Sequence, residues 1–171
     1  MAEYALVVSD SQLLREIRQT KPFRNSSQEA ALSLMRTAHL IQRNYSRFVE
    51  PHGLTIQQYN VLRILRGGGG VGLPTLEIGQ RMIEQTPGIT RLLDRLEAKT
   101  MVKRERSSHD RRQVFCWIAP AGLALLSKID DPIDHGGEEA FAALKEDEIR
   151  ALIGQLERLR QTLGKILGLE L

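Results

Sequence analysis

Apolar residues recur at three- and four-residue spacing along much of the chain, which predicts amphipathic helices. One such pattern starts at Gln28 and ends before Pro51 and Gly53, which break helices. Its apolar positions are Leu34, Ala38, Ile41, Tyr45 and Phe48. A capping-box pattern, Thr55 followed by Gln58, then predicts a second helix that ends at Gly67. The four glycines at 67–70 form a loop.

The middle of the chain predicts two short helices separated by a tight turn. Pro74 and Thr75 open the first, and a turn follows at residues 83–85. Thr86 followed by Pro87 predicts the start of the next helix, because threonine caps free amides and proline is tolerated at the first helical position. That helix extends to about Lys99, with a buried face formed by Ile89, Leu92, Leu93 and Leu96.

Two β-type runs follow, at residues 102–106 and 113–118, and flank the polar turn at 107–110. They predict one hairpin. Two helices joined by a turn and followed by a basic hairpin are typical of a winged helix-turn-helix. Beyond Pro120 the pattern returns to helix, with an interruption expected around 131–132 and 136–137. It resumes with Ile149, Leu152, Leu156, Leu159, Leu163 and Leu167.

The sequence therefore predicts a mainly α fold with one small β-hairpin. We expect a partly helical N-terminal extension at 1–27 and a main unit at 28–171. Within it, 54–118 form the winged helix-turn-helix lobe, and 28–50 and 120–171 form dimerisation helices. Their apolar stripes exceed what one small winged domain covers, which favours a homodimer. Packing within one chain is the alternative.

Composition narrows the functional classes. Of the residues, 42% are hydrophobic and 26% charged, as in a water-soluble globular protein, and no run of ~18 apolar residues predicts a membrane span. A single cysteine, Cys116, fits a reducing cytoplasm. Residues 81–115 hold nine Lys/Arg against five Asp/Glu, whereas residues 121–171 hold six against ten. This polarised charge favours nucleic-acid binding by the central segment.

Three motifs in that segment carry a family resemblance. They are residues 90–97 (TRLLDRLE), residues 102–104 (VKR) and residues 110–112 (DRR). Together they resemble the recognition helix and wing of the MarR (multiple antibiotic resistance regulator) family, and the looser similarity extends from about 28 to 167. The resemblance implies a homodimeric transcriptional regulator, a repressor by default, that binds palindromic double-stranded DNA.

The predicted recognition helix offers several DNA contacts. Small residues at its start allow close approach to phosphates, and Arg91 and Arg95 lie one turn apart where they can reach guanine edges or phosphates. Gln85 could read adenine. The alternative is that both arginines pair with Asp94 and Glu97 on a solvated face. The candidate contacts of this region are Thr75, Gln85, Thr86, Gly88, Thr90, Arg91 and Arg95.

The resemblance implies that the wing tip enters the minor groove. The family's wing arginine matches Arg112, and the aspartate that steadies it matches Asp110; Arg111 is a second candidate. Arginine suits the enhanced negative potential of a narrow minor groove. We expect backbone contacts from Lys103, Arg104 and Arg106. The alternative is that the basic hairpin is a soluble sheet edge protected by charge.

The resemblance also implies a pocket for a small aromatic or phenolic effector between the dimerisation helices and the DNA-binding lobe. His39, Arg43 and Tyr59 are candidate lining residues, although a core histidine, a surface arginine and a packing tyrosine are alternatives. Oxidation-sensing relatives have a cysteine near the N-terminal helix, whereas Cys116 lies in a wing strand, so we expect it to pack. Ala119 replaces the family's frequent helix-capping threonine.

No residue arrangement supports an enzyme. The four histidines are not at metal-ligand spacing, there is no nucleophile elbow, and the glycine run lacks the lysine of a phosphate loop. We therefore expect no catalytic site, metal or cofactor, and no membrane partner. A winged domain that binds only proteins remains a rival, because fold does not dictate function.

Overall fold

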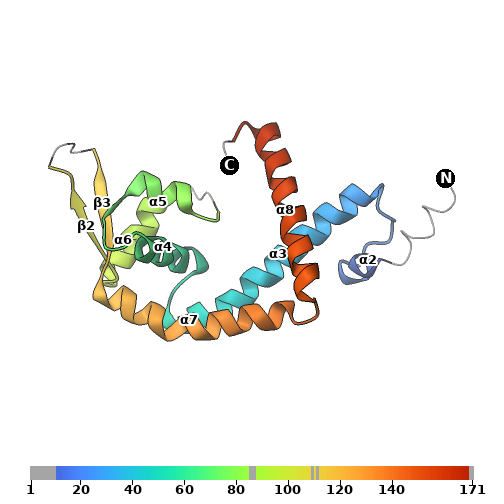
Figure 1. Cartoon of the computed structure of the whole chain (residues 1–171), viewed down its shortest axis with the longest axis horizontal. Helices are drawn as coiled ribbons and strands as arrows, with labels where there is room; N and C mark the ends of the chain where they lie inside the picture. The colour runs from blue at the N-terminus through green and yellow to red at the C-terminus, as the bar shows by residue number, and fades with distance from the viewer. Residues whose placement is uncertain (1–10, 85–87, 109, 111, 170–171) are drawn as a thin grey trace. The chain divides into compact units, whose positions relative to one another are not determined.

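The computed structural model describes residues 11–84, 88–108, 110 and 112–169. The chain forms two compact units, 1–47 and 48–171, which we describe separately. In the first unit, helix α2 (Gln12–Glu16) is followed by the long helix α3 (Ser26–Val49), whose last two residues belong to the second unit (Figure 1). Leu13, Leu14 and Phe23 are buried together and pack against Leu32 of α3. The N-terminal extension therefore has a small core of its own.

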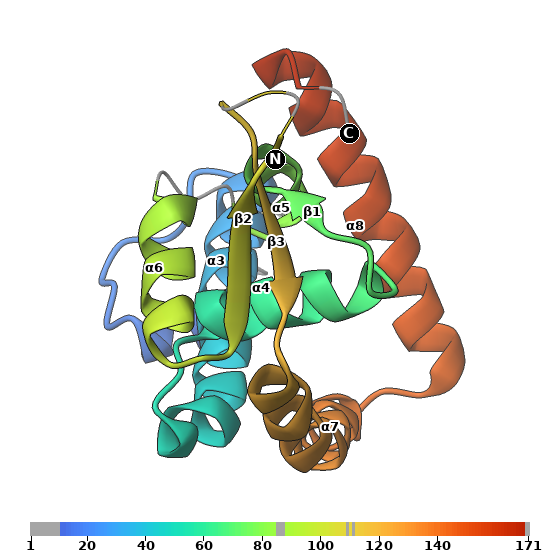
Figure 2. The same ribbon diagram turned by 90° about the vertical axis from the view of Figure 1, so that its left-hand side faces the viewer.

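The second unit contains the winged helix-turn-helix (Figures 1 and 2). Its elements are η1 (Glu50–His52), α4 (Ile56–Gly67), β1 (Leu73–Pro74), α5 (Thr75–Arg81), α6 (Ile89–Ala98), β2 (Val102–Arg106), β3 (Val114–Ile118), α7 (Pro120–Phe141) and α8 (Glu146–Leu167). Leu62 and Leu65 of α4, Ile78 of α5, and Leu93 and Leu96 of α6 are almost fully buried and form the centre of this lobe. The mainly helical winged fold is as predicted.

Helix α4 begins as the sequence predicts. The Gln58 backbone N–H donates to Thr55 Oγ1 at 3.2 Å, and the Thr55 backbone N–H donates to Gln58 Oε1 at 3.1 Å. This reciprocal capping box satisfies two amides that would otherwise lack partners. It fixes the start of the helix against which α5, α6 and α7 pack.

The sheet has three antiparallel strands in the order β1-β3-β2, where the sequence predicted only the hairpin. Leu73 of β1 pairs with Cys116 of β3, and Val102 of β2 pairs with Ile118. Strand β1 is two residues long and follows the glycine run, so it has no alternating pattern to detect. Gly72 lies under the Trp117 ring, where a Cβ atom would be 2.3 Å from ring carbons.

Helix α6 starts later than expected. Gly88 precedes the helix as its N-cap with φ 130°, outside the helical region, and offers no capping side chain. The sequence placed Gly88 inside the helix. Glycine adopts a positive φ without the steric cost that other residues incur, so the chain turns there instead of continuing the helix. The expected start at Thr86 and Pro87 lies outside the described residues.

The interruption expected around Pro132 and Gly136 is wrong, because α7 is continuous from Pro120 to Phe141. The Phe48 ring occupies the space beside Gly136, where a Cβ atom would lie 2.4 Å from ring carbons. Ile129 and Ile133 are buried on the same helix. This packing stabilises the helix despite the backbone hydrogen bond that Pro132 removes. The break comes instead at 142–145, before α8.

Two further features of α7 are its N-cap residue and its hydrogen bonds to α4. Ala119 is its N-cap and makes no side-chain cap bond, as the sequence predicts. Asp130 accepts two hydrogen bonds from the Arg66 guanidinium of α4, at 2.6 and 3.1 Å. This bidentate pair joins the first helix of the lobe to α7.

None of the helices among the described residues combines the length and apolarity that a membrane crossing needs.

Candidate nucleic-acid interface

Helix α6 has the two faces that the sequence predicts. Leu93 and Leu96 are buried, and Ile89 and Leu92 are half-buried. The opposite face exposes Thr90, Arg91, Asp94 and Arg95. Since the apolar face fixes the helix on the lobe, the polar face is the surface available to a partner.

Arg104 joins this helix to the wing, beside which α6 lies (Figure 2). Its guanidinium donates to Glu97 Oε2 from Nε at 2.9 Å and from Nη2 at 2.5 Å. Nη2 also lies 2.7 Å from Asp94 Oδ1. The hydrogen bond to Glu97 raises the pKa of Arg104 more than burial lowers it. The Arg104 side chain is 21% exposed and is bound by both carboxylates, and its expected contact with the DNA backbone stays a prediction.

This arrangement bears on Arg91 and Arg95. The alternative was that they pair with Asp94 and Glu97, but both carboxylates bind Arg104. Within the described ranges, neither Arg91 nor Arg95 forms an ion pair or side-chain hydrogen bond, and both are exposed. The positive charge on this face of α6 is therefore not neutralised by its own helix.

The wing turn is held by local hydrogen bonds. Asp110 Oδ1 accepts from the Arg112 backbone N–H at 2.9 Å, and Ser107 Oγ accepts from the Asp110 backbone N–H at 3.2 Å. The Gln113 N–H donates to the Asp110 carbonyl at 2.9 Å. Arg112 is exposed at this turn. Asp110 thus orders the backbone that carries Arg112, whereas Arg111 lies outside the described residues.

The remaining candidate contacts differ in their surroundings. Lys103 and Arg106 are exposed on β2, and Lys103 Nζ lies 2.5 Å from Glu105 Oε1. Thr75 is half-buried, and its hydroxyl donates to the Val114 carbonyl at 3.1 Å. That bond ties α5 to β3 and gives Thr75 a structural role in addition to the expected one. Gln85 and Thr86 lie outside the described residues.

Comparison with known proteins identifies this architecture. The MarR family model matches residues 52–113. MhqR of Bacillus subtilis, an HTH-type transcriptional regulator, is 30% identical over 128 residues, which are 74% of this chain and 86% of MhqR. This chain belongs to the MarR family. TtmR of Methylorubrum extorquens, also named an HTH-type transcriptional regulator, is 37% identical over 127 residues, and the alignment spans 63% of its length.

Solved MarR-type structures agree with the fold. A MarR transcription factor from Planctomyces limnophilus is 36% identical with a TM-score of 0.62, covering 79% of this chain and 98% of that one. MepR of S. aureus, solved with DNA, has a TM-score of 0.71 at 19% identity and covers 77% of this chain and 96% of its own. BpsR of Bordetella bronchiseptica has a TM-score of 0.68 at 21% identity over 77% and 98%. This MarR-family member is a DNA-binding transcriptional regulator, and its family consists of regulators rather than enzymes.

The candidate effector residues of this MarR-type chain lie in both units. His39 and Arg43 are exposed on α3 in the first unit. Tyr59 is buried in the second unit, with the Arg63 guanidinium carbon 5.8 Å from its ring centroid. Burial raises the pKa of Tyr59 more than the Arg63 charge lowers it. Tyr59 thus has the surroundings of a packing residue.

Cys116 is fully buried on β3. Burial raises the pKa of its thiol, although the Thr75 hydroxyl 3.7 Å away lowers it in part. A neutral, enclosed thiol is a poor nucleophile. The expected packing role fits these surroundings.

Sequence reasoning missed the residues that position the turn between α5 and α6. Asn60 Oδ1 on α4 accepts from the Ile83 backbone N–H at 3.1 Å. Gln57 Nε2, also on α4, donates to Glu84 Oε2 at 3.2 Å. Only their polarity signalled them, and it does not set them apart from the other polar residues of α4. Arg104 could have been found from the opposite charges of Asp94 and Glu97 on the neighbouring helix.

Proposed function

We propose that this MarR-family regulator binds a pseudo-palindromic operator as a homodimer and represses transcription in the cytoplasm. Helix α6 enters the major groove and the wing enters the adjacent minor groove. One observation carries the proposal: Arg91 and Arg95 share an exposed face of α6 while Arg104 holds the nearby carboxylates.

The two arginines of α6 have complementary tasks in this proposal. Because they lie four residues apart on one helix, their guanidinium groups lie one turn apart along the groove. Each can form two hydrogen bonds with a guanine edge, worth ~1–3 kcal/mol of discrimination against a wrong base. Gly88 and the small Thr90 at the helix start leave room for a phosphate near the N-terminal amides.

The wing supplies the second groove contact. In the described part of its turn, Ser107 and Asp110 accept backbone hydrogen bonds, and Arg112 is exposed there. A fixed backbone lowers the entropy lost when the arginine enters a narrow minor groove. Lys103 and Arg106 contact neighbouring phosphates, and this electrostatic part of the affinity falls with salt.

The homodimer is supported by apolar side chains that the single chain leaves exposed. Helix α8 exposes Ile153, Leu159, Leu163, Ile166 and Leu167. Helix α3 exposes Leu34, Met35 and Leu40. Covering such stripes with a second copy removes them from water and gives twofold symmetry. Two recognition helices then match half-sites one DNA turn, ~34–36 Å, apart.

A small aromatic or phenolic ligand releases the operator in this proposal. The BpsR structure concerns regulation of DNA binding by 6-hydroxynicotinic acid, which is an aromatic acid. Exposed His39 and Arg43 on α3 are the candidate carboxylate partners here, while buried Tyr59 is the weakest of the three. A ligand acts only by favouring a dimer whose helix spacing misfits the operator. Failure of every aromatic acid to shift operator affinity would refute this part.

The groove assignment is tested with duplexes recovered by selection from a random library. Arg91→Ala and Arg95→Ala are titrated against the best duplex and against single-base variants of it at several salt concentrations. An arginine that reads a base loses preference at one position in each half-site, whereas loss of a phosphate contact weakens all duplexes alike. Arg150→Ala, on α8 and paired with Glu146, is the control. Wild-type affinity of both α6 variants for every duplex would overturn the proposal.

A further inference from the structure

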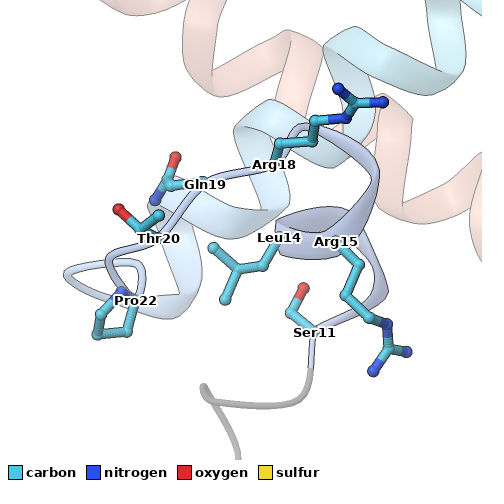
Figure 3. Close-up of a pocket in the computed structure, with 7 residues that line it drawn as sticks. All are labelled: Ser11, Leu14, Arg15, Arg18, Gln19, Thr20 and Pro22. Atoms are coloured by element: carbon cyan, nitrogen blue, oxygen red, sulfur yellow. The ribbon is translucent and has the colours of Figure 1, made fainter.

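A pocket and an ion pair among the described residues have no task in the proposed function. The pocket lies beside α2 in the first unit, and Figure 3 shows the guanidinium groups of Arg15 and Arg18 pointing away from each other. Because a small anion needs donors that converge, this pocket does not favour a charged ligand. The ion pair joins Arg66 of α4 to Asp130 of α7, and both residues lie in the second unit. It links the DNA-binding lobe to the helix that leads to α8.

The start of α7 is fixed on the lobe by close contacts with the backbone. The Ala119 N–H donates to the Met101 carbonyl at 2.9 Å. In the first turn of the helix, a Cβ atom on Gly122 would lie 2.6 Å from the same carbonyl oxygen and 3.2 Å from a Leu62 methyl carbon. The helix approaches this closely because Gly122 has no side chain. Helix α7 therefore has one fixed point near its N-terminal end.

A second fixed point is needed to determine the tilt of α7. Ile129 and Ile133 are buried on this helix, but apolar burial has no directional preference of its own. Asp130 lies eight residues after Gly122, ~12 Å further along the helix. There its carboxylate accepts from Arg66 Nη1 at 2.6 Å and from Arg66 Nη2 at 3.1 Å. Because a bidentate pair has a defined geometry, it supplies the second point.

The surroundings of the pair favour it. The Arg66 and Asp130 side chains are 35% and 30% exposed, so water screens their charges less than those of a fully exposed pair. Asp134, one turn after Asp130 on α7, adds negative charge that stabilises the Arg66 guanidinium. The hydrogen bonds with Asp130 raise the pKa of Arg66 more than burial lowers it. The pair is therefore partly shielded and electrostatically favoured.

We propose that the Arg66–Asp130 pair fixes the tilt of α7 on the DNA-binding lobe and thereby sets the half-site spacing that the dimer accepts. The inference rests on the proposed function, in which a second copy covers the exposed apolar side chains of α8. Because α7 connects the lobe to α8, a change in its tilt changes the distance between the two α6 helices. A displacement of ~1.7 Å at each α6 changes their separation by ~3.4 Å, the rise of one base pair. Arg66 and Asp130 are thus positioning residues, which act on DNA through α6.

The test uses three duplexes, which carry the selected half-sites at the selected spacing or with one base pair deleted or inserted between them. Arg66→Met removes the ion pair. Arg66→Met combined with Asp130→Leu removes it without leaving a carboxylate unpaired, and apolar replacement of both partners can restore stability. Thr55→Ala is the matched control, because it destabilises the same helix by removing the capping box at the opposite end of α4 from Arg66.

We expect the ratio of affinities for the selected and altered spacings to fall about three- to fivefold in Arg66→Met and in the double variant, because a partly exposed pair biases the spacing only by its own free energy. Thr55→Ala is expected to keep the wild-type ratio even if its thermal midpoint falls as far. A wild-type ratio in either Arg66 variant, or an equal fall in Thr55→Ala, overturns the inference. A wild type that binds the selected duplex as a monomer overturns the proposed function instead.

A second measurement follows the two lobes of the dimer without DNA. Ala98→Cys places a spin label at the exposed C-terminal end of α6, while Cys116 is fully buried. Pulsed electron-spin resonance then gives the distribution of distances between the two labels. We expect this distribution to be broader with Arg66→Met than in the wild-type or Thr55→Ala background. Distributions of equal mean and width in the three backgrounds contradict the positioning role.

Discussion

Replacement of Arg104 by methionine tests how the wing supports the recognition helix. Methionine keeps much of the side-chain length but removes the three short contacts to Asp94 and Glu97. Charge-assisted hydrogen bonds contribute ~1.5–3 kcal/mol each when buried. Here Asp94 and Glu97 are 54% and 41% exposed, so water weakens the bonds towards the ~0.2–1 kcal/mol of exposed pairs. We expect a total loss of about 1–2 kcal/mol in unfolding free energy.

The loss of DNA affinity should exceed what this destabilisation explains. A chain of this length loses about 2–4 °C in thermal midpoint per kcal/mol, so the Arg104→Met variant stays folded at 25 °C. Its freed carboxylates then lie beside Arg91 and Arg95, where they compete with phosphate and guanine. We expect operator affinity, measured by fluorescence anisotropy, to fall at least about tenfold, which corresponds to ~1.4 kcal/mol.

A rescue variant makes the reasoning falsifiable. Adding Asp94→Asn and Glu97→Gln to Arg104→Met removes the negative charges but restores none of the lost hydrogen bonds. DNA affinity should recover while the thermal midpoint stays low. If Arg104→Met binds the operator as tightly as the wild type, or if the triple variant binds no better than Arg104→Met, carboxylate neutralisation is not the role of Arg104.

Three further predictions follow from particular contacts. Arg112→Ala should weaken operator binding at least about tenfold with an unchanged thermal midpoint and dimer mass; equal affinities refute the minor-groove role. Gly72→Ala should lower the thermal midpoint because its Cβ would lie 2.3 Å from the Trp117 ring, whereas Gly154→Ala meets no atom within 4 Å and is the control. Burial raises the pKa of the Cys116 thiol, so the folded state keeps the thiol proton to a higher pH than the unfolded state does. This contribution to stability is present below the ordinary thiol pKa and is lost as pH rises through the raised value. A thiol reagent at pH 8 should accordingly react slowly with folded protein and quickly in denaturant, and fast labelling of the folded state contradicts this.

The sequence predicted those elements whose hydrophobic pattern repeats over several helical turns or along a strand. The spacing of Leu92, Leu93 and Leu96 oriented α6 correctly because one buried stripe settles which face is exposed. Thr55 and Gln58 likewise determined the start of α4, since a capping box is a local interaction. The hairpin was predicted because its two strands and its turn are adjacent in the sequence. Strand β1 has only two residues, and it is defined by its pairing with β3.

The errors arose where distant residues override a local rule. Pro132 and Gly136 normally interrupt helices, but Phe48 packs against Gly136 from far along the chain and the helix continues. The partners of Arg104 on α6, which determine where its guanidinium points, were not predicted because they lie on another element. The grouping of His39 and Arg43 with Tyr59 followed the pocket that the family resemblance implies, and it stays a prediction.

Selection of bound duplexes from a random library tests the central claim most directly. If paired copies of α6 and the wing read one double helix, the recovered motif is an inverted repeat. Its half-sites are centred about one turn, ~10 base pairs, apart, with guanines at positions that lose their preference in the Arg91 or Arg95 variants. Recovery of no enriched motif, or of a single asymmetric site bound by a monomer, would contradict the account.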